Sequence, residues 1–333
     1  MTVTELVGAV LTRPSIDGSA AADVLALHWG IAGDLRSLPS ERDRNFAVAV
    51  DGVDRYVLKI SNGNEDPAFL HLQHRAMERL ATAGVPCQLP VPSRDGREVV
   101  ETGAPAAPNL ARVLTWLPGR PLATIPPAER AAALLHDLGR VMGRTAAALE
   151  GFDHPAAHRD FQWSAEQDLA VVAAHAPAVI DPERVALLDE WQRRLAPLAE
   201  AFATLRHGVI HNDANDHNVL AADDGQSISG LLDLGDAVWS VVVNELAVAA
   251  AYAALGSDDP LSVIEQVRAG FDAALPLTAS EAAVLLELVA LRLATSVVLS
   301  AHQSRLAPDD PYLTVSEQPA WALLARLAQE PQQ

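Results

Sequence analysis

The hydrophobic pattern of this chain changes at Pro118-Gly119-Arg120-Pro121, and this change constrains the fold more than any other feature. Before the break, the runs 45–50 and 55–60 have the character of short β-strands, and the turn-like residues 51–54 between them predict a hairpin. After the break, most segments are long, rich in Ala and Leu, and helical. The sequence therefore predicts an α+β fold, with a small β-rich lobe at 1–117 and a large, mainly helical lobe at 118–333.

The β-rich lobe also contains predicted helices at 21–30 and 66–83, and further strand candidates within 98–117. In the run 55–60, alternate residues face opposite sides of the sheet, which places Lys59 on a partly apolar face beside Val57. This pattern leaves two interpretations open: Lys59 has a function, or it is a surface lysine.

The second lobe is predicted to be helical over most of its length. A strand and loop at 209–220 interrupt the helices, and a short strand at 227–232 leads into Asp233. The predicted helices cover 128–150, 164–175, 182–206, 243–255, 261–273, 279–305 and 317–329.

The composition excludes several classes of partner. The chain has 333 residues and a formal net charge of −19, whereas nucleic acids and anionic membranes favour clusters of Lys and Arg. No apolar run is long enough to cross a bilayer without charges, and the N-terminus lacks the features of a signal peptide. The single cysteine, Cys87, lies in an apolar stretch, which favours a structural role. We expect a cytoplasmic protein that binds neither nucleic acid nor membrane.

Two polar motifs stand out against this background. Residues 209–220 have the pattern H-x-D-x-x-x-x-N between apolar flanks, and residues 231–236 have the pattern apolar-apolar-D-x-G. Together these motifs supply the groups that phosphoryl transfer needs, namely a carboxylate for the attacking hydroxyl and oxygen ligands for Mg²⁺.

The spacing of these motifs predicts a role for each residue. Asp213 would accept the proton of the attacking hydroxyl, while Asn218 and Asp233 would bind Mg²⁺ through oxygen. Lys59 would neutralise the α- and β-phosphates of a nucleotide, and His211 would support the catalytic loop rather than transfer protons.

The residues that carry these motifs also resemble a known family. The chain is similar to aminoglycoside-phosphotransferase-like small-molecule kinases, relatives of the protein-kinase fold, and most similar to the branch with hydroxylysine kinase and aminopropanol kinase. The matching pieces follow one another in order along nearly the whole chain: 40–46, 56–60, 114–122, 151–155, 211–218, 233–236 and 244–247.

The resemblance implies a two-lobed kinase that binds ATP or GTP between its lobes. It implies that the purine meets the backbone of Thr115, Trp116 and Leu117, and that the turn with Arg44 and Asn45 covers the phosphates.

One departure from the family's pattern concerns Lys59. Such kinases usually pair this lysine with a helix glutamate, but the corresponding stretch, 69–75, contains no acid. Gln73, Glu65 or Glu78 would have to replace it, unless Lys59 is held in another way.

The acids that remain around the motifs bear on the substrate. A phosphate site does not tolerate this many further negative charges without a cation. The acids therefore predict either a substrate ammonium or bracing of the loop, and they are Asp216, Asp236 and Glu245. Trp163 and Trp239 would contact the amine or pack in the core.

Arg292 lies on an otherwise apolar helical stretch and would meet a substrate carboxylate or an internal acid. Because no paired arginine clamp is evident, the sequence favours a small amino alcohol, such as 1-amino-2-propanol or ethanolamine, as the phosphoryl acceptor. Hydroxylysine kinase, homoserine kinase, an aminoglycoside-type antibiotic kinase and a nucleotide-binding pseudokinase remain as alternatives. The apolar pattern at the N-terminus predicts either packing on the chain's own domain or a docking helix for a larger assembly, and it consists of Val3, Leu6, Val7, Val10 and Leu11.

Overall fold

The computed structural model describes residues 14–40, 43–103, 108–306 and 317–330. The chain divides into two compact units, of which the first ends at Pro118 and the second starts at Gly119. The first unit is built on an antiparallel sheet and the second is mainly helical, which confirms the predicted α+β class. The predicted docking pattern at residues 3–11 lies outside the described residues.

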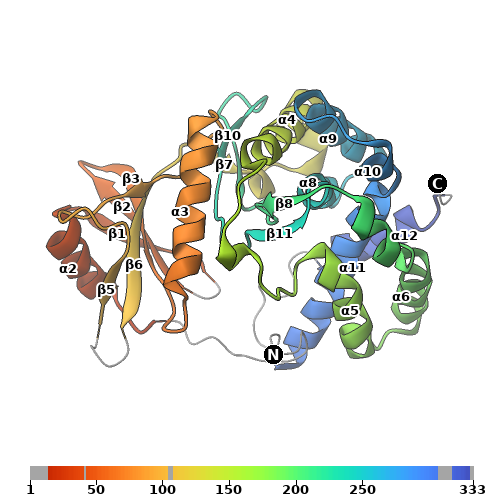
Figure 1. The fold of residues 1–333 in the computed structure, drawn as a ribbon, viewed down its shortest axis with the longest axis horizontal. Coiled ribbons are helices and arrows are strands. Elements are labelled where there is room, and N and C mark those ends of the chain that lie inside the picture. Colours follow the sequence, from red (N-terminus) through yellow and green to blue (C-terminus); the bar gives the residue numbers. More distant parts are fainter. Residues whose placement is uncertain (1–13, 41–42, 104–107, 307–316, 331–333) are drawn as a thin grey trace. The chain divides into compact units, whose positions relative to one another are not determined.

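The sheet of the first unit has the order β1-β2-β3-β6-β4, and β5 pairs with β6 (Figure 1). All these pairings are antiparallel, and the predicted hairpin is confirmed as β2–β3, with Asp51 and Gly52 in the left-handed conformation at its turn. The strand β1 was not predicted. The strands are β1 (Asp34–Leu38), β2 (Arg44–Val50), β3 (Val53–Ile60), β4 (Pro90–Val91), β5 (Val100–Thr102) and β6 (Asn109–Thr115).

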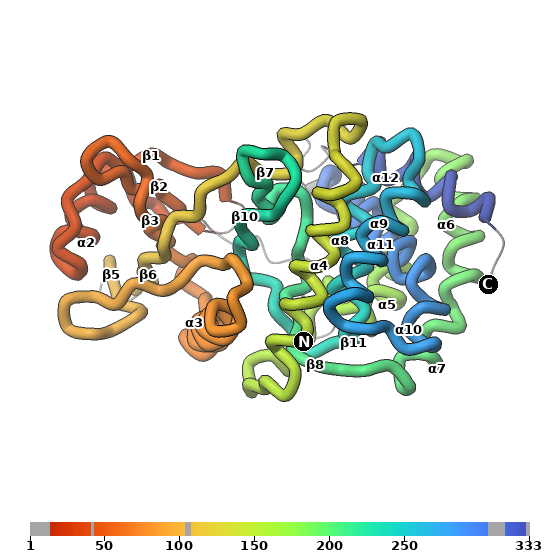
Figure 2. The backbone as a smooth tube through the Cα atoms, turned by 90° about the horizontal axis from the view of Figure 1, so that it is seen from above, coloured from red at the N-terminus to blue at the C-terminus, as the bar shows by residue number. Residues whose placement is uncertain are grey.

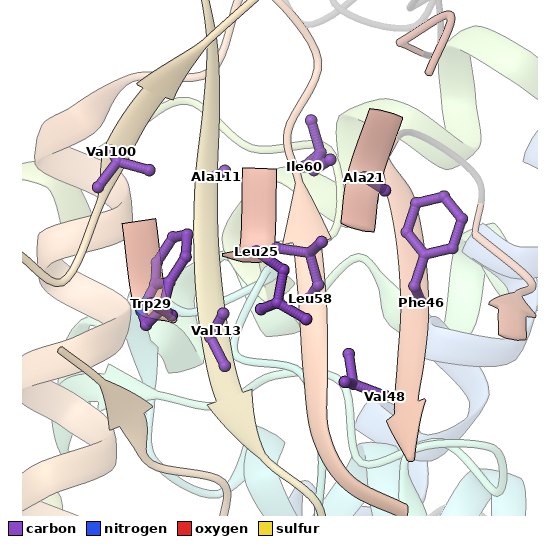
Figure 3. Close-up of a cluster of buried hydrophobic side chains, with 10 residues drawn as sticks. All are labelled: Ala21, Leu25, Trp29, Phe46, Val48, Leu58, Ile60, Val100, Ala111 and Val113. Carbon is purple, nitrogen blue, oxygen red and sulfur yellow. The ribbon is translucent and has the colours of Figure 1, made fainter. Parts of the chain in front are cut away.

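A helix covers each face of this sheet. On one face, α2 (Gly18–Trp29) points Leu25 and Trp29 at Leu58 of β3 and Val113 of β6, as Figure 3 shows. On the other face, α3 (Pro67–Thr82) lies over β6, where Gln73 accepts a hydrogen bond from Arg112 at 2.7 Å.

Lys59 lies on the α3 face, opposite Asn45 of β2 and Arg112 of β6. Only 6% of Lys59 is exposed, so the interpretation of Lys59 as a surface lysine was wrong. The sheet places it inside the unit, where an ammonium group needs anionic or hydrogen-bonding partners.

The second unit combines helices with two small sheets. One sheet has the order β10-β9-β7 and the other pairs β11 with β8. The helices are α4 (Ala132–Leu149), α5 (Ala165–His175), α6 (Pro182–Leu195), α7 (Leu198–Ala201), α8 (Asn244–Ala254), α9 (Pro260–Ala274), α10 (Ala279–Ala283), α11 (Leu285–Leu306) and α12 (Glu317–Leu327), and the strands are β7 (Arg120–Pro121), β8 (His207–Ile210), β9 (Val219–Ala221), β10 (Ile228–Leu231) and β11 (Val238–Val241).

Two predicted helices are each split in the structure. The segment 182–206 divides into α6 and α7 around Pro197, which lacks the N–H that a continuous helix needs. The segment 279–305 divides into α10 and α11 at Val284.

Helices α4 and α9 run side by side in both views (Figures 1 and 2). Glycines line the crossing, because a Cβ on Gly139 would lie 1.8 Å from the carbonyl oxygen of Val267, and one on Gly270 would lie 1.8 Å from that of His136. The two backbones therefore touch where the sequence has no side chains.

One helix, α11, is long and apolar enough to cross a membrane over Leu285–Arg305, but most of this span is buried inside the unit. It contains Glu287 and Arg292, and Arg292 is itself 3% exposed. The helix thus packs as a core helix of this unit, and the cytoplasmic location stays a prediction.

Candidate active site

The H-x-D motif forms the loop between β8 and β9. His211 begins this loop fully buried, with its Nε2 2.8 Å from the carbonyl oxygen of Leu232 and its Nδ1 accepting the N–H of Asp213 at 3.1 Å. These partners require the proton to be on Nε2. Burial lowers the pKa of His211, so the ring is neutral and braces the loop.

Glu245, in the first turn of α8, holds the backbone at the start of the loop. Its Oε1 accepts the N–H of His211 at 2.5 Å and its Oε2 accepts the N–H of Asn212 at 3.2 Å. Burial raises the pKa of this fully buried carboxyl to about 7. Both oxygens are therefore occupied within the protein, which favours bracing over contact with a substrate ammonium.

Asn212 has a left-handed backbone, with φ of 68°, which is strained for a residue with a side chain. Its side chain fixes this conformation, because Nδ2 donates to the carbonyl oxygen of Trp163 at 3.0 Å and Oδ1 accepts from Asn244 at 2.9 Å. These bonds hold the strained backbone of Asn212, and that backbone conformation sets the direction of the next residue, Asp213.

Three side chains surround the carboxylate of Asp213. Asn215 donates to Oδ1 at 2.9 Å, Asn218 donates to Oδ2 at 2.7 Å, and Arg292 of α11 donates to Oδ1 at 3.4 Å. The motif spacing thus brings Asp213 and Asn218 into direct contact, while Arg292 arrives from a distant helix.

The electrostatic environment adjusts the basicity of Asp213. Burial and the nearby charge of Asp236 raise the pKa of Asp213 well above its usual range, whereas Arg292 and the hydrogen bond from Asn215 oppose this shift. A carboxylate with a raised pKa accepts a proton more readily, as a general base requires.

Asp233 follows β10 and also has a left-handed backbone, with φ of 54°. Its Oδ1 accepts the N–H of Gly235 at 3.0 Å, and the carbonyl oxygen of Asn218 accepts the N–H of Leu232 at 2.8 Å. The bond between Leu232 and Asn218 links the two motifs. Because Nδ2 of Asn218 donates to Asp213, the amide oxygen of Asn218 is the atom that can bind a cation. The carboxylate of Asp233 supplies oxygen of the kind that Mg²⁺ prefers, so the residues present fit this ion.

Within the described ranges, no group of three or more His, Cys, Asp or Glu side chains could hold a metal ion. A metal bound by Asn218 and Asp233 would therefore need further ligands, such as phosphate oxygens.

Asp216 lies at the far side of the loop and braces it. Its carboxylate is 3.8 Å from Arg130, and its carbonyl oxygen accepts the N–H of Ala123 at 2.8 Å. Burial raises its pKa. For Asp216, as for Glu245, the contacts favour the bracing interpretation. Asp236 remains as the acid whose charge acts on Asp213.

The two candidate tryptophans have different surroundings. The ring of Trp163 stacks under the guanidinium of Arg292, with Cζ 4.5 Å from the ring centroid, which places it beside the group that contacts Asp213. Trp239 instead stacks on His158, with the ring centroids 4.8 Å apart. The contacts of Trp239 therefore favour the packing interpretation.

In the first unit, two of the three residues proposed for the partner of Lys59 have other contacts. Gln73 binds Arg112, and Glu78 forms an ion pair with Arg75 at 2.7 Å. The question of a substitute glutamate for Lys59 thus stays open. Cys87 is buried, and burial raises the pKa of its thiol to about 11, which suits a structural cysteine.

The segment proposed for the purine ends β6. The N–H and C=O of Thr115 pair with Leu89 and Gln88, and the N–H of Trp116 donates to Arg55. Arg44 stacks on the ring of Phe46, with Cζ 5.6 Å from the centroid, and Asn45 lies opposite Lys59.

Sequence reasoning missed several residues around Asp213 and Arg292. Asn215 lies within the motif, and an amide two residues after an acid is a signal that could have identified it. Asp168 on α5 had a subtler signal, because an acid occurs there at a position spaced as a buried residue of the helix. Tyr252, whose ring centroid is 5.8 Å from Cζ of Arg292, had none.

Comparisons with known proteins identify the family of this chain. Residues 34–284 match the family described as the phosphotransferase enzyme family. The hydroxylysine kinase of Bos taurus is 29% identical over an alignment of 349 positions. The alignment covers 95% of this chain and 90% of that protein.

Solved structures show the same fold. A microcompartment-associated aminopropanol kinase is 19% identical with a TM-score of 0.69, covering 94% of this chain and 95% of that one. The amicoumacin kinase hAmiN was solved in complex with AMP-PNP, Ca²⁺ and Ami. It is 18% identical with a TM-score of 0.69, and the match covers 95% of this chain and 93% of that one. The chain therefore belongs to the phosphotransferase enzyme family, with a protein-kinase-like fold, and is a small-molecule kinase.

Proposed function

We propose that this kinase transfers the γ-phosphoryl group of ATP or GTP to the hydroxyl of a small metabolite that carries a cationic nitrogen, either an amino alcohol or a hydroxy amino acid. The observation that carries this proposal is the environment of Asp213, whose partly buried carboxylate is oriented by Asn215, Asn218 and Arg292. Hydroxylysine kinase and aminopropanol kinase, to which the chain is similar, have names that fit such acceptors.

In the proposed reaction, Asp213 accepts the proton of the acceptor hydroxyl as its oxygen attacks the γ-phosphorus. The new P–O bond forms while the bond from the γ-phosphorus to the β–γ bridging oxygen breaks, which leaves a nucleoside diphosphate. The hydrogen bonds from Asn215 and Asn218 keep the carboxylate in one orientation, so little reorganisation accompanies proton transfer.

Asn218 and Asp233 would hold Mg²⁺, which when bound neutralises charge on the transferring phosphoryl group. Lys59 would bind the phosphates of the nucleotide, and Arg44 and Asn45 would contribute to the segment that covers them. Because hydrogen bonds within the first unit use Thr115 and the N–H of Trp116, we propose the carbonyl of Trp116 and the amide of Leu117 as the groups for the purine.

The carboxylates of Asp216 and Glu245 bind Arg130 and the loop backbone, so neither is proposed to bind the ammonium of the acceptor. Trp163 lies near enough to Arg292 to form one wall of the acceptor site.

A substrate panel tests this function. Ethanolamine, both enantiomers of 1-amino-2-propanol, hydroxylysine, homoserine and an aminoglycoside are each incubated with ATP or GTP and Mg²⁺, and the products are followed by ³¹P NMR. We expect one of the small hydroxy amines to be phosphorylated.

The panel also separates the alternatives. Phosphorylation of the aminoglycoside alone would favour an antibiotic kinase, and nucleotide binding without transfer to any acceptor would favour a pseudokinase. Neutral alcohols that react as well as their amino analogues would refute the ammonium site.

A further inference from the structure

The buried guanidinium of Arg292 has hydrogen-bonding capacity that the protein does not use. Its side chain is 3% exposed, and Nη2 makes one long hydrogen bond of 3.4 Å to Asp213. The hydroxyl of Tyr252 also interacts with the guanidinium, but among the described residues Nε and Nη1 have no partner with hydrogen-bond geometry. Leaving the hydrogen-bond donors of a charged group unpaired in the interior is costly. The unpaired donors of Arg292 beside Asp213 therefore indicate that a group on the substrate accepts their hydrogen bonds.

A buried carboxylate lies on α5, which packs against α11. Asp168 of α5 is 1% exposed, and within the described part of the chain its Oδ1 has no hydrogen-bond partner. Helix α5 packs against α11, and the charge of Arg292 opposes the rise that burial causes in the pKa of Asp168, so the two groups are near each other. Thr295, three residues after Arg292 on α11, has a buried hydroxyl that interacts with Asp168, although no described residue meets this hydroxyl with hydrogen-bond geometry.

The unpaired donors and the unpaired acceptor therefore occur together without satisfying one another. A water molecule would bind both groups but would neutralise neither charge. A simple amino alcohol would bring an ammonium for Asp168 and leave the donors of Arg292 unpaired. The zwitterionic group of an α-amino acid would satisfy both, because its carboxylate and ammonium are on one carbon.

On the basis of the kinase function above, we propose that Arg292 binds the carboxylate and Asp168 the ammonium of the same acceptor, which is therefore a hydroxylated α-amino acid. The contact between Arg292 and Asp213 would then join recognition of the carboxylate to placement of the hydroxyl. This assignment replaces the preference for an amino alcohol, which rested on the absence of a paired arginine clamp, because Asp168 supplies the second point of attachment.

Matched pairs of acceptors that differ only in the carboxylate test the proposal. They are threonine with 1-amino-2-propanol, serine with ethanolamine, homoserine with 3-amino-1-propanol, and hydroxylysine with its decarboxylated diamine. In the wild-type enzyme, we expect the amino acid of the reactive pair to have a kcat/KM roughly 10- to 100-fold higher, the range for hydrogen bonds to a charged group.

Variants assign this preference to its residues. In Arg292→Met, the ratio of kcat/KM between amino acid and amine should fall by about 10-fold or more, and comparison within one enzyme cancels any general loss from disturbing Asp213. Asp168→Asn should instead lower the preference for the amino acid over its deaminated hydroxy acid. Arg268→Met, which removes a partly exposed arginine paired with Glu265 on α9, should keep the wild-type ratio.

The outcomes distinguish this inference from the proposed function. Phosphorylation of the amines with no preference for the amino acids, or a wild-type ratio that persists in Arg292→Met, overturns the head-group site alone. Transfer to none of the acceptors overturns the kinase proposal and this inference with it. If Arg292→Met does not fold, Arg292→Lys keeps the charge without the guanidinium geometry and should also lower the ratio.

Discussion

At the scale of single residues, the second unit places several carboxylates in the interior and gives each a different partner. Glu245 binds backbone N–H groups, Asp213 binds amides and Arg292, and Asp168 retains an oxygen that no described residue binds. Because desolvation disfavours a buried charge unless it is compensated, these partners decide which acids ionise at neutral pH.

Asp168 should make the stability of the protein depend on pH. Burial raises its pKa to about 8, above its ordinary value of 3.8, although the charge of Arg292 opposes the shift and Glu166 adds to it. Without substrate, the folded state binds a proton between these pH values that the unfolded chain releases, and an ammonium bound beside Asp168 would displace this proton. The free energy of unfolding should therefore fall as pH rises through this window.

We expect Asp168→Asn, which does not titrate, to lose less stability than the wild type between about pH 5 and about pH 8. Urea unfolding of both proteins at the two pH values measures this difference. Equal losses in the two proteins would show that Asp168 is not protonated in the folded state.

The sequence was most informative about contacts between residues that are close together in the chain. The motif fixes Asp213, Asn215 and Asn218 within one loop, so their proximity follows from spacing alone. Arg292 is 79 residues after Asp213, and its contact depends on how α11 packs. No local pattern contains that information, and this is why the sequence left two interpretations of Arg292 open.

At the scale of elements, backbone contact between α4 and α9 is the main requirement that the helical unit imposes on its sequence. A Cβ on Gly139 would overlap the backbone of Val267 at 1.8 Å, whereas one on Gly143 would lie 2.7 Å from the carbonyl oxygen of Phe271. Alanine favours a helix over glycine by about 1 kcal/mol, which is too little to offset such an overlap.

The variants Gly139→Ala, Gly143→Ala and Gly18→Ala should therefore show graded effects. We expect the largest loss of stability for Gly139→Ala, about 2 kcal/mol or more, and a smaller loss for Gly143→Ala. Gly18→Ala is the control, because nothing lies within 4 Å of the added Cβ. Urea unfolding gives the order, and equal stabilities for the first and last variants would contradict the crossing.

The sequence predicted the type of most elements but not their limits. The hairpin β2–β3 and the helix α3 follow from alternation and helical spacing, and Asp66 caps α3 through a bond to the N–H of Ala68. The strand β1 was missed because it is partly exposed on the edge of the sheet, and such a strand has a weak hydrophobic pattern.

At the scale of the whole molecule, the proposed reaction needs Lys59 from the first unit and Asp213 from the second. The resemblance to kinases supplied this division of roles, which composition and periodicity alone do not contain. The assignment of 1–117 and 118–333 as functional lobes remains a proposal.

Metal removal gives a test at this scale. We expect chelation with EDTA to stop phosphotransfer and Mg²⁺ to restore it. The variant Asp233→Asn should need roughly 10-fold more Mg²⁺ for half-maximal rate, because it loses a charged oxygen ligand. Asp224→Asn, on the exposed turn between β9 and β10, is the control. An Asp233→Asn enzyme with an unchanged Mg²⁺ requirement would exclude Asp233 as a ligand.

The most direct test of the central claim is the rate of phosphotransfer by Asp213→Asn, measured together with its affinity for nucleotide. The structure predicts a rate lower by about 10²- to 10⁴-fold, because asparagine cannot accept the hydroxyl proton, and nucleotide affinity close to that of the wild type. The exposed Asp223→Asn should be unaffected in both. Phosphotransfer by Asp213→Asn at a rate near that of the wild type would contradict the assignment of Asp213 as the catalytic base.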